Sequence, residues 1–163
     1  MIRAVGPVPR WAKVATLLLS LAGLGVSIYL TITHFQPQLL ICSSTGTVDC
    51  AAVTTSAQSY FLGVPVAVLG LAQYAVMTAL TTPWAWQSKR YELHVARFAL
   101  SVVAMAFVLW LLAAELLIID HICLWCTGVH VITFALLVVL TRVTPTQLGW
   151  TFSDSSTRDA LAR

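Results

Sequence analysis

Four long apolar stretches, separated by more polar segments, set the pattern of this sequence. None of them shows the alternation of apolar and polar residues that is typical of the strands of a membrane β-barrel. A helix of about 20 residues crosses a hydrocarbon core about 30 Å thick, and helices satisfy their own backbone hydrogen bonds in lipid. The pattern therefore predicts an all-α integral membrane protein, a bundle of four transmembrane helices at about residues 14–33, 61–81, 97–119 and 122–141.

The composition supports a membrane protein and excludes other classes. Of the 163 residues, 59% are apolar and 9% are charged, whereas a soluble domain is roughly 45–50% apolar and about 25% charged. Disorder requires low hydrophobicity and high charge. A net charge of +3 is too small for a nucleic-acid-binding surface. The first apolar run is longer than the core of a typical signal peptide and no A-x-A site follows it, so we expect it to remain as a helix.

The basic residues predict the orientation in the membrane. None lies in the connection after the first or the third span, and cytoplasmic loops carry the excess of Lys and Arg. We therefore expect both termini in the cytoplasm, with a long outer loop at residues 34–60. We expect one membrane domain over residues 1–144, followed by a polar cytoplasmic tail at residues 145–163. The nine basic residues are Arg3, Arg10, Lys13, Lys89, Arg90, Arg97, Arg142, Arg158 and Arg163.

All four cysteines lie on the predicted outer side. Cys42 and Cys50 belong to the long outer loop, and Cys123 and Cys126 form a Cys-x-x-Cys at the outer start of the fourth span. An extracytoplasmic compartment allows disulfides to form and persist. The arrangement suggests three interpretations: two inert disulfides, a zinc site that also uses His121 or His130, or a redox relay.

We favour the relay. A Cys-x-x-Cys closes too small a ring to be a useful staple, and the Cys42–Cys50 spacing is not that of a usual zinc knuckle. A cysteine in the first turn of a helix has a lowered thiol pKa, and Asp120 is placed to cap this helix. Two pairs in series would carry electrons from outer thiols to a membrane acceptor.

Two polar residues near the pair have open roles. His130 follows Cys126 at i+4 on the same helix face, where it would hydrogen-bond a substrate or make a polar contact between helices. Glu115 would accept protons, or its side chain would extend to the membrane interface; we favour the interface.

These residues resemble the vitamin K epoxide reductase family, most closely a bacterial member without a fused thioredoxin-like domain. The order of the cysteines, a spaced loop pair followed by Cys-x-x-Cys, is the most specific feature. The resemblance also rests on residues 25–31 of the first span, on residues 122–126, and on Ser56, Phe61, Gly63, Pro65, Gly70 and Tyr74.

The resemblance implies an enzyme that oxidises thiols and passes the electrons to a quinone. Cys42 and Cys50 would be the shuttle pair, Cys123 would exchange with that pair, and Cys126 would face the quinone. The candidate quinone contacts are Ser56, Phe61, Trp125 and His130.

The predicted function is a membrane thiol:quinone oxidoreductase that supports disulfide formation outside the cytoplasm. A quinone of the menaquinone, ubiquinone or vitamin K type would be the electron acceptor, and we expect no metal cofactor. The expected partners are the lipid bilayer and a separate thioredoxin-like thiol protein, with no nucleic acid. The alternatives are a true vitamin K epoxide or quinone reductase and a non-enzymatic metal-binding membrane protein.

Overall fold

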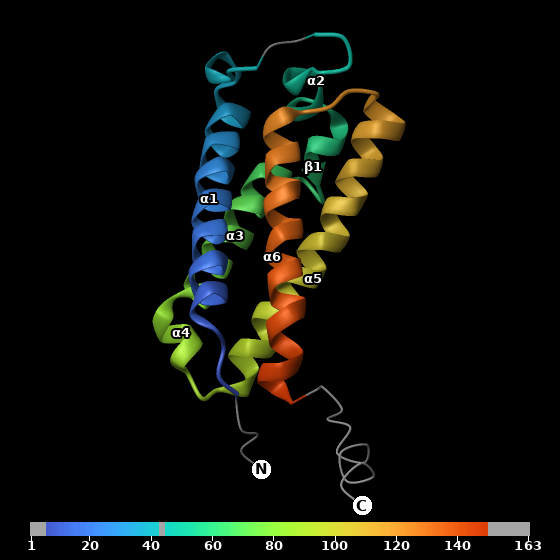
Figure 1. Cartoon of the computed structure of the whole chain (residues 1–163). Coiled ribbons are helices and arrows are strands. Elements are labelled where there is room, and N and C mark those ends of the chain that lie inside the picture. The colour runs from blue at the N-terminus through green and yellow to red at the C-terminus, as the bar shows by residue number, and fades with distance from the viewer. Residues whose placement is uncertain (1–5, 43–44, 150–163) are drawn as a thin grey trace, which may run out of the picture.

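The computed structural model describes residues 6–42 and 45–149. Four helices form the bundle and run roughly side by side (Figure 1). They are α1 (Arg10–Phe35), α3 (Val66–Thr81), α5 (Tyr91–Ala114) and α6 (Leu124–Leu148). A π-helical turn, η3 (Glu115–Ile119), extends α5. The short helix α4 (Pro83–Gln87) connects α3 to α5 at the end of the bundle where α1 begins and α6 ends.

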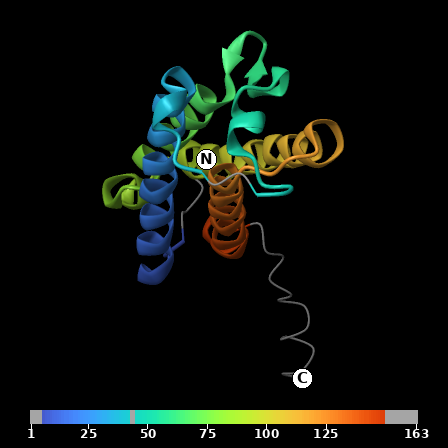
Figure 2. The same cartoon turned by 90° about the horizontal axis from the view of Figure 1, so that it is seen from above.

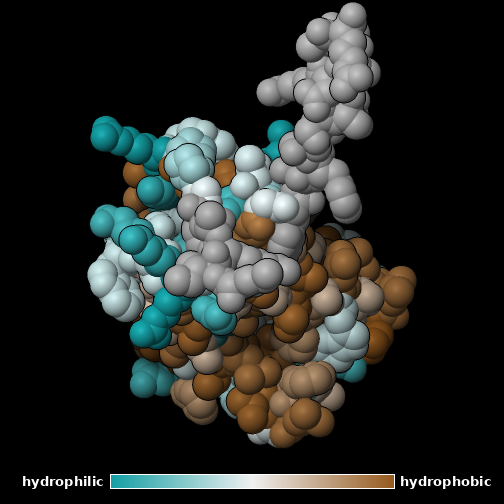
Figure 3. All heavy atoms as spheres, turned by 90° about the horizontal axis from the view of Figure 1, so that it is seen from below, coloured by the Kyte–Doolittle hydropathy of each residue, from teal (hydrophilic) through white to brown (hydrophobic). Residues whose placement is uncertain are grey.

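Three of these helices are long and apolar enough to cross a membrane: Arg10–Phe35, Tyr91–Ile119 and Leu124–Leu148. Their outer surfaces expose more large apolar side chains than the surface of a soluble protein does. For example, Leu18, Leu109, Val131 and Phe134 are between 57% and 61% exposed. Figure 3 shows apolar side chains gathered over a broad part of the surface seen from below. The protein is therefore an integral membrane protein.

The second predicted span begins later than expected. The sequence predicted a helix from residue 61, but α3 starts at Val66 and has 16 residues, which is about 24 Å of helix. The preceding residues form a small hairpin of β1 (Tyr60–Phe61) and β2 (Val64–Pro65). Gly63 in its turn has φ of +82°, a left-handed conformation that glycine adopts at no steric cost.

Other predicted boundaries also move. The third helix begins at Tyr91, ahead of the predicted residue 97, and the fourth runs to Leu148 and so includes the first residues of the predicted tail. The remainder of that tail, residues 150–163, lies outside the described residues. Arg97 is buried inside the bundle, and its Nε and Nη2 atoms donate to the Leu80 carbonyl at 2.9 and 2.6 Å. This basic residue therefore links α5 to the end of α3.

A close contact holds α1, α3 and α6 together at mid-bundle. A Cβ atom added to Gly23 of α1 would overlap the ring of Tyr74 of α3, so this position requires glycine. The Tyr74 hydroxyl reaches α6, where it lies 2.8 Å from Thr133 Oγ1 and donates to the Val129 carbonyl at 3.2 Å. The buried tyrosine thus joins three helices near the middle of the bundle.

The outer loop is folded over the opposite end of the bundle (Figure 1 and Figure 2). It contains the 3-10 turns η1 (Pro37–Leu39) and η2 (Ala57–Ser59) and the short helix α2 (Cys50–Thr54). Asp49 caps α2, since its carboxylate accepts the Ala52 N–H at 3.0 Å. The loop thus brings the residues on both sides of Asp49 to the start of α6.

Candidate functional site

Backbone pairing places the outer loop beside the Cys-x-x-Cys segment. The Asp49 N–H donates to the Ile122 carbonyl at 3.1 Å, and the Ile122 N–H donates to the Thr47 carbonyl at 2.9 Å. Cys50 follows Asp49, and Cys123 follows Ile122. Both cysteines are buried, at 1% and 0% exposure, in one apolar cluster at this end of the bundle.

The loop cysteines form a disulfide, and the Cys-x-x-Cys pair is free. Cys42 and Cys50 are bonded with their Cα atoms 6.1 Å apart. Cys42 is half-buried, unlike its fully buried partner. Cys123 and Cys126 are both unbonded cysteines. The buried half of one pair therefore packs in the same cluster as the buried half of the other.

Cys123 itself caps α6, which corrects the expectation that Asp120 would do so. The Cys126 N–H donates to Cys123 Sγ at 3.3 Å. Asp120 ends η3 in a left-handed conformation with φ of +58°, which aspartate tolerates better than most residues. Hydrogen bonding by the Cys126 thiol lowers the pKa of the Cys123 thiol, although burial and the Glu115 carboxylate oppose this effect.

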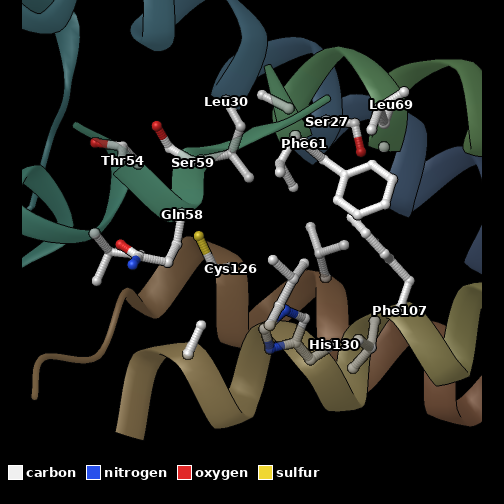
Figure 4. Close-up of a pocket in the computed structure, with 18 of the residues that line it drawn as sticks. Ser27, Leu30, Thr54, Gln58, Ser59, Phe61, Leu69, Phe107, Cys126 and His130 are labelled. Atoms are coloured by element: carbon white, nitrogen blue, oxygen red, sulfur yellow. The ribbon is translucent and has the colours of Figure 1, made fainter. Parts of the chain in front are cut away.

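An apolar cavity of about 480 Å³ opens next to this pair, between the helices and the outer loop. Figure 4 shows Cys126 and His130 from α6 facing the same space as Phe61 and Phe107. The walls are mostly apolar, with a few polar groups, as in sites for small apolar ligands. Cys126 is thus the member of the pair that is open to a ligand.

Three of the four candidate quinone contacts meet in this cavity. Ser56, Phe61 and His130 line it, together with Glu115. The Ser56 hydroxyl donates to the Val53 carbonyl at 2.8 Å and keeps its oxygen as an acceptor. The sequence pattern did not identify other polar residues that line the cavity, among them Thr54 and Gln58.

Trp125 lies elsewhere. Its ring packs 4.6 Å from that of Tyr29, and its Nε1–H donates to the Ile41 carbonyl at 2.9 Å. The Tyr29 hydroxyl in turn accepts the Ile41 N–H at 2.8 Å. Trp125 directly precedes Cys126, and adjacent residues on a helix do not face the same side, so Trp125 points away from the cavity. Together with Tyr29 it holds the backbone next to Cys42, a role that the sequence pattern did not indicate.

His130 and Glu115 are both buried, at 6% and 4% exposure. Within the described part of the chain, His130 Nδ1 has no hydrogen-bond partner. This favours a ligand contact over a polar contact between helices. The expectation that Glu115 extends to the membrane interface is wrong, because the π-helical turn directs it into the protein. The backbone N–H of Cys123 donates to the Glu115 carboxyl group.

The family comparison decides what kind of protein carries this site. The sequence model of the vitamin K epoxide reductase family matches residues 14–141, which includes all four cysteines and most of the cavity. The chain belongs to the vitamin K epoxide reductase family. No match was found among curated proteins. Membership makes the protein a membrane oxidoreductase of a family that uses quinone as electron acceptor.

A metal site that uses all four cysteines is not supported by their arrangement in the structure. Two of the four cysteines are joined in a disulfide and so are not thiolate ligands. Over residues 6–42 and 45–149, no group of three or more His, Cys, Asp or Glu side chains is arranged to hold a metal ion.

Proposed function

We propose that this protein is a membrane thiol:quinone oxidoreductase that supports disulfide formation outside the cytoplasm. One observation carries the proposal: Cys50 and Cys123 share a buried cluster, while Cys126 opens into an apolar cavity. The two cysteine pairs are thus arranged in series between the protein surface and a site suited to an apolar electron acceptor.

The first half of the route is thiol-disulfide exchange. A thiolate of an outer thioredoxin-like protein attacks Cys42, the more exposed sulfur, and releases Cys50 as a thiolate. Cys50 then attacks Cys123 in an oxidised Cys123–Cys126 pair and releases the Cys126 thiolate. The second thiol of the partner frees Cys42, which attacks Cys50 and restores the loop disulfide. The products are one disulfide in the partner and a reduced Cys123–Cys126 pair.

The second half uses the cavity. The reduced pair transfers two electrons and two protons to the quinone, which leaves the Cys123–Cys126 disulfide and a quinol. Cys126 faces the substrate, and Cys123 closes the disulfide. His130 is the proposed donor to a quinone oxygen, and the Ser56 oxygen is the proposed acceptor for a hydroxyl of the quinol that forms. The Phe61 ring packs against the apolar part of the substrate.

We also propose the arrangement of this machinery in the membrane. In the described residues the basic side chains lie at the end of the bundle opposite to the cysteines. By the positive-inside rule that end is cytoplasmic. The hairpin before α3 extends its apolar surface, so that α3 with this hairpin forms a fourth crossing.

Reduction of vitamin K epoxide or vitamin K quinone in the same cavity is the alternative substrate assignment, because the cavity is apolar and lies beside Cys126. A metal-binding protein without turnover is the alternative outside catalysis.

The proposal is tested with purified protein in lipid nanodiscs, dithiothreitol as donor and a short-chain quinone as acceptor. We expect quinol to form at a rate proportional to the protein concentration. Cys126→Ser should abolish this rate, because only Cys126 faces the cavity. The exposed-residue variant Trp84→Phe, at the other end of the bundle, should keep it. No turnover by the unmodified protein, with stoichiometric bound metal instead, would overturn the proposal.

A further inference from the structure

Glu115 has a position that the thiol-exchange route does not explain. It lies in the π-helical turn at the end of α5, it is 4% exposed, and it lines the same cavity as Cys126. A buried carboxylate without a charged partner is costly. If this position served only packing, an apolar residue would fill it at a lower cost in free energy.

The surroundings of Glu115 contain thiols and no cation. The Cys123 N–H donates to the Glu115 carboxyl group, and both Cys123 and Cys126 interact electrostatically with this group. Among the described residues, all Lys and Arg side chains belong to the opposite end of the bundle. The titratable residues on the elements around η3 are Asp49, Asp120, His121, Cys123, Cys126 and His130.

The chemistry at Cys126 requires a group that moves protons. A dithiol must lose two protons as it forms a disulfide, and a quinone must gain two as it becomes a quinol. The cavity is apolar, so water is a poor carrier there. A carboxylate beside both thiols and at the wall of the cavity lies between the proton source and the proton acceptor.

We propose that Glu115 carries the protons from the Cys123–Cys126 dithiol to the quinone oxygens. This role rests on the proposed function. The Glu115 carboxylate takes the proton as the Cys126 S–H bond breaks. The Cys126 sulfur uses its electron pair to form a bond to a quinone carbon, the C=O π electrons move onto a quinone oxygen, and Glu115 returns the proton to that oxygen.

The second proton follows the same path. Cys123 loses its proton to Glu115 as its sulfur forms the bond to Cys126. The second quinone oxygen receives that proton, and the electron pair that held Cys126 to the substrate leaves with the quinol. Glu115 ends as the carboxylate with which it began. One dithiol and one quinone have become one disulfide and one quinol.

The test follows a single turnover of pre-reduced protein mixed with a short-chain quinone between pH 5 and pH 9. Glu115→Gln should slow quinol formation by roughly 10²–10⁴-fold near neutral pH, the range typical of a lost acid–base group. The slow rate should rise with pH, as hydroxide replaces the missing carboxylate. The quinone concentration that gives the half-maximal rate should change little. Glu92→Gln, at an exposed position of α5, is the matched control and should behave like the unmodified protein.

A spectroscopic readout keeps the proposal falsifiable if Glu115→Gln folds poorly. In the unmodified protein, infrared difference spectra during the turnover should show a transient protonated carboxyl group, and Glu115→Asp should shift this band. Absence of the band in the unmodified protein would overturn the role of Glu115. So would a Glu115→Gln rate within about threefold of the unmodified rate at every pH. If the unmodified protein forms no quinol at all, the proposed function itself fails.

Discussion

At the scale of single residues, the relay depends on four sulfur atoms with different surroundings. Cys50 and Cys123 are almost completely buried, whereas Cys42 and Cys126 are each partly accessible. Cys42 borders an outer groove near Trp125, and Cys126 borders the apolar cavity. Electrons would therefore arrive at one accessible sulfur, cross a buried contact and leave from the other.

This order predicts the behaviour of a variant that lacks Cys42. In Cys42→Ser, Cys50 attacks Cys123 as before, but no thiol remains to resolve the product. A Cys50–Cys123 disulfide should accumulate, visible by mass spectrometry of a non-reduced digest of protein treated with quinone. Cys50→Ser is the control that cannot form this bridge. A bridge between Cys50 and Cys126 would reverse the roles assigned to the two Cys-x-x-Cys residues.

The sequence identifies the candidate reacting residues but does not give their orientation. The cysteines are identifiable because their chemistry is specific and all four lie at one predicted membrane face. Orientation depends on where a helix begins, and each residue turns a helix by about 100°. The structure starts α6 at Leu124 with Cys123 as its cap, so Trp125 faces away from the cavity. The burial of Glu115 likewise depends on a π-helical turn that no periodicity revealed.

At the scale of elements, α1 and α3 pack against each other without free space at Gly23. Tyr74 of α3 fills the position in front of Gly23 of α1 and bonds to α6. Gly25, two residues further along α1, has no neighbouring atom within 4 Å of an added Cβ. The two glycines therefore form a matched pair for mutation.

We expect Gly23→Ala to destabilise the protein and Gly25→Ala to be neutral or stabilising. Overpacking costs about 1–3 kcal/mol, whereas alanine gains up to about 1 kcal/mol over glycine in an unhindered helix. Denaturant unfolding of the two variants in matched detergent measures both changes. Equal stability of the two variants would contradict the packing of Tyr74 against α1.

The element boundaries show which sequence signals are reliable. The long apolar helices α1, α5 and α6 follow directly from uninterrupted hydrophobic runs. The start of α3 does not, because residues 60–65 are apolar enough to extend the run and yet form a hairpin. Gly63 and Pro65 are the local signals for that turn, and apolar length alone hides them.

At the scale of the whole molecule, the proposed electron route requires the two ends of the bundle to face opposite sides of the membrane. Cys42 lies at the end of the bundle that carries the long loop, and the exposed residue Gln87 lies at the end of α4, near the basic residues. In intact cells, after mild reduction, an impermeant thiol reagent should label Cys42. A cysteine introduced by Gln87→Cys should be labelled only after the membrane is permeabilised. Labelling of the introduced cysteine from outside would invert the predicted topology.

In the proposed function, the loop pair relays electrons to the pair that reduces the quinone. The most direct measurement compares two donors for the double variant Cys42→Ser/Cys50→Ser: dithiothreitol and a reduced thioredoxin-like protein. We expect the small dithiol to drive quinol formation still, because it reaches the Cys-x-x-Cys disulfide directly. The protein donor should lose all activity, because it exchanges only with the loop pair. Loss with both donors would place the loop pair in the quinone site, and full activity with both would remove it from the electron route.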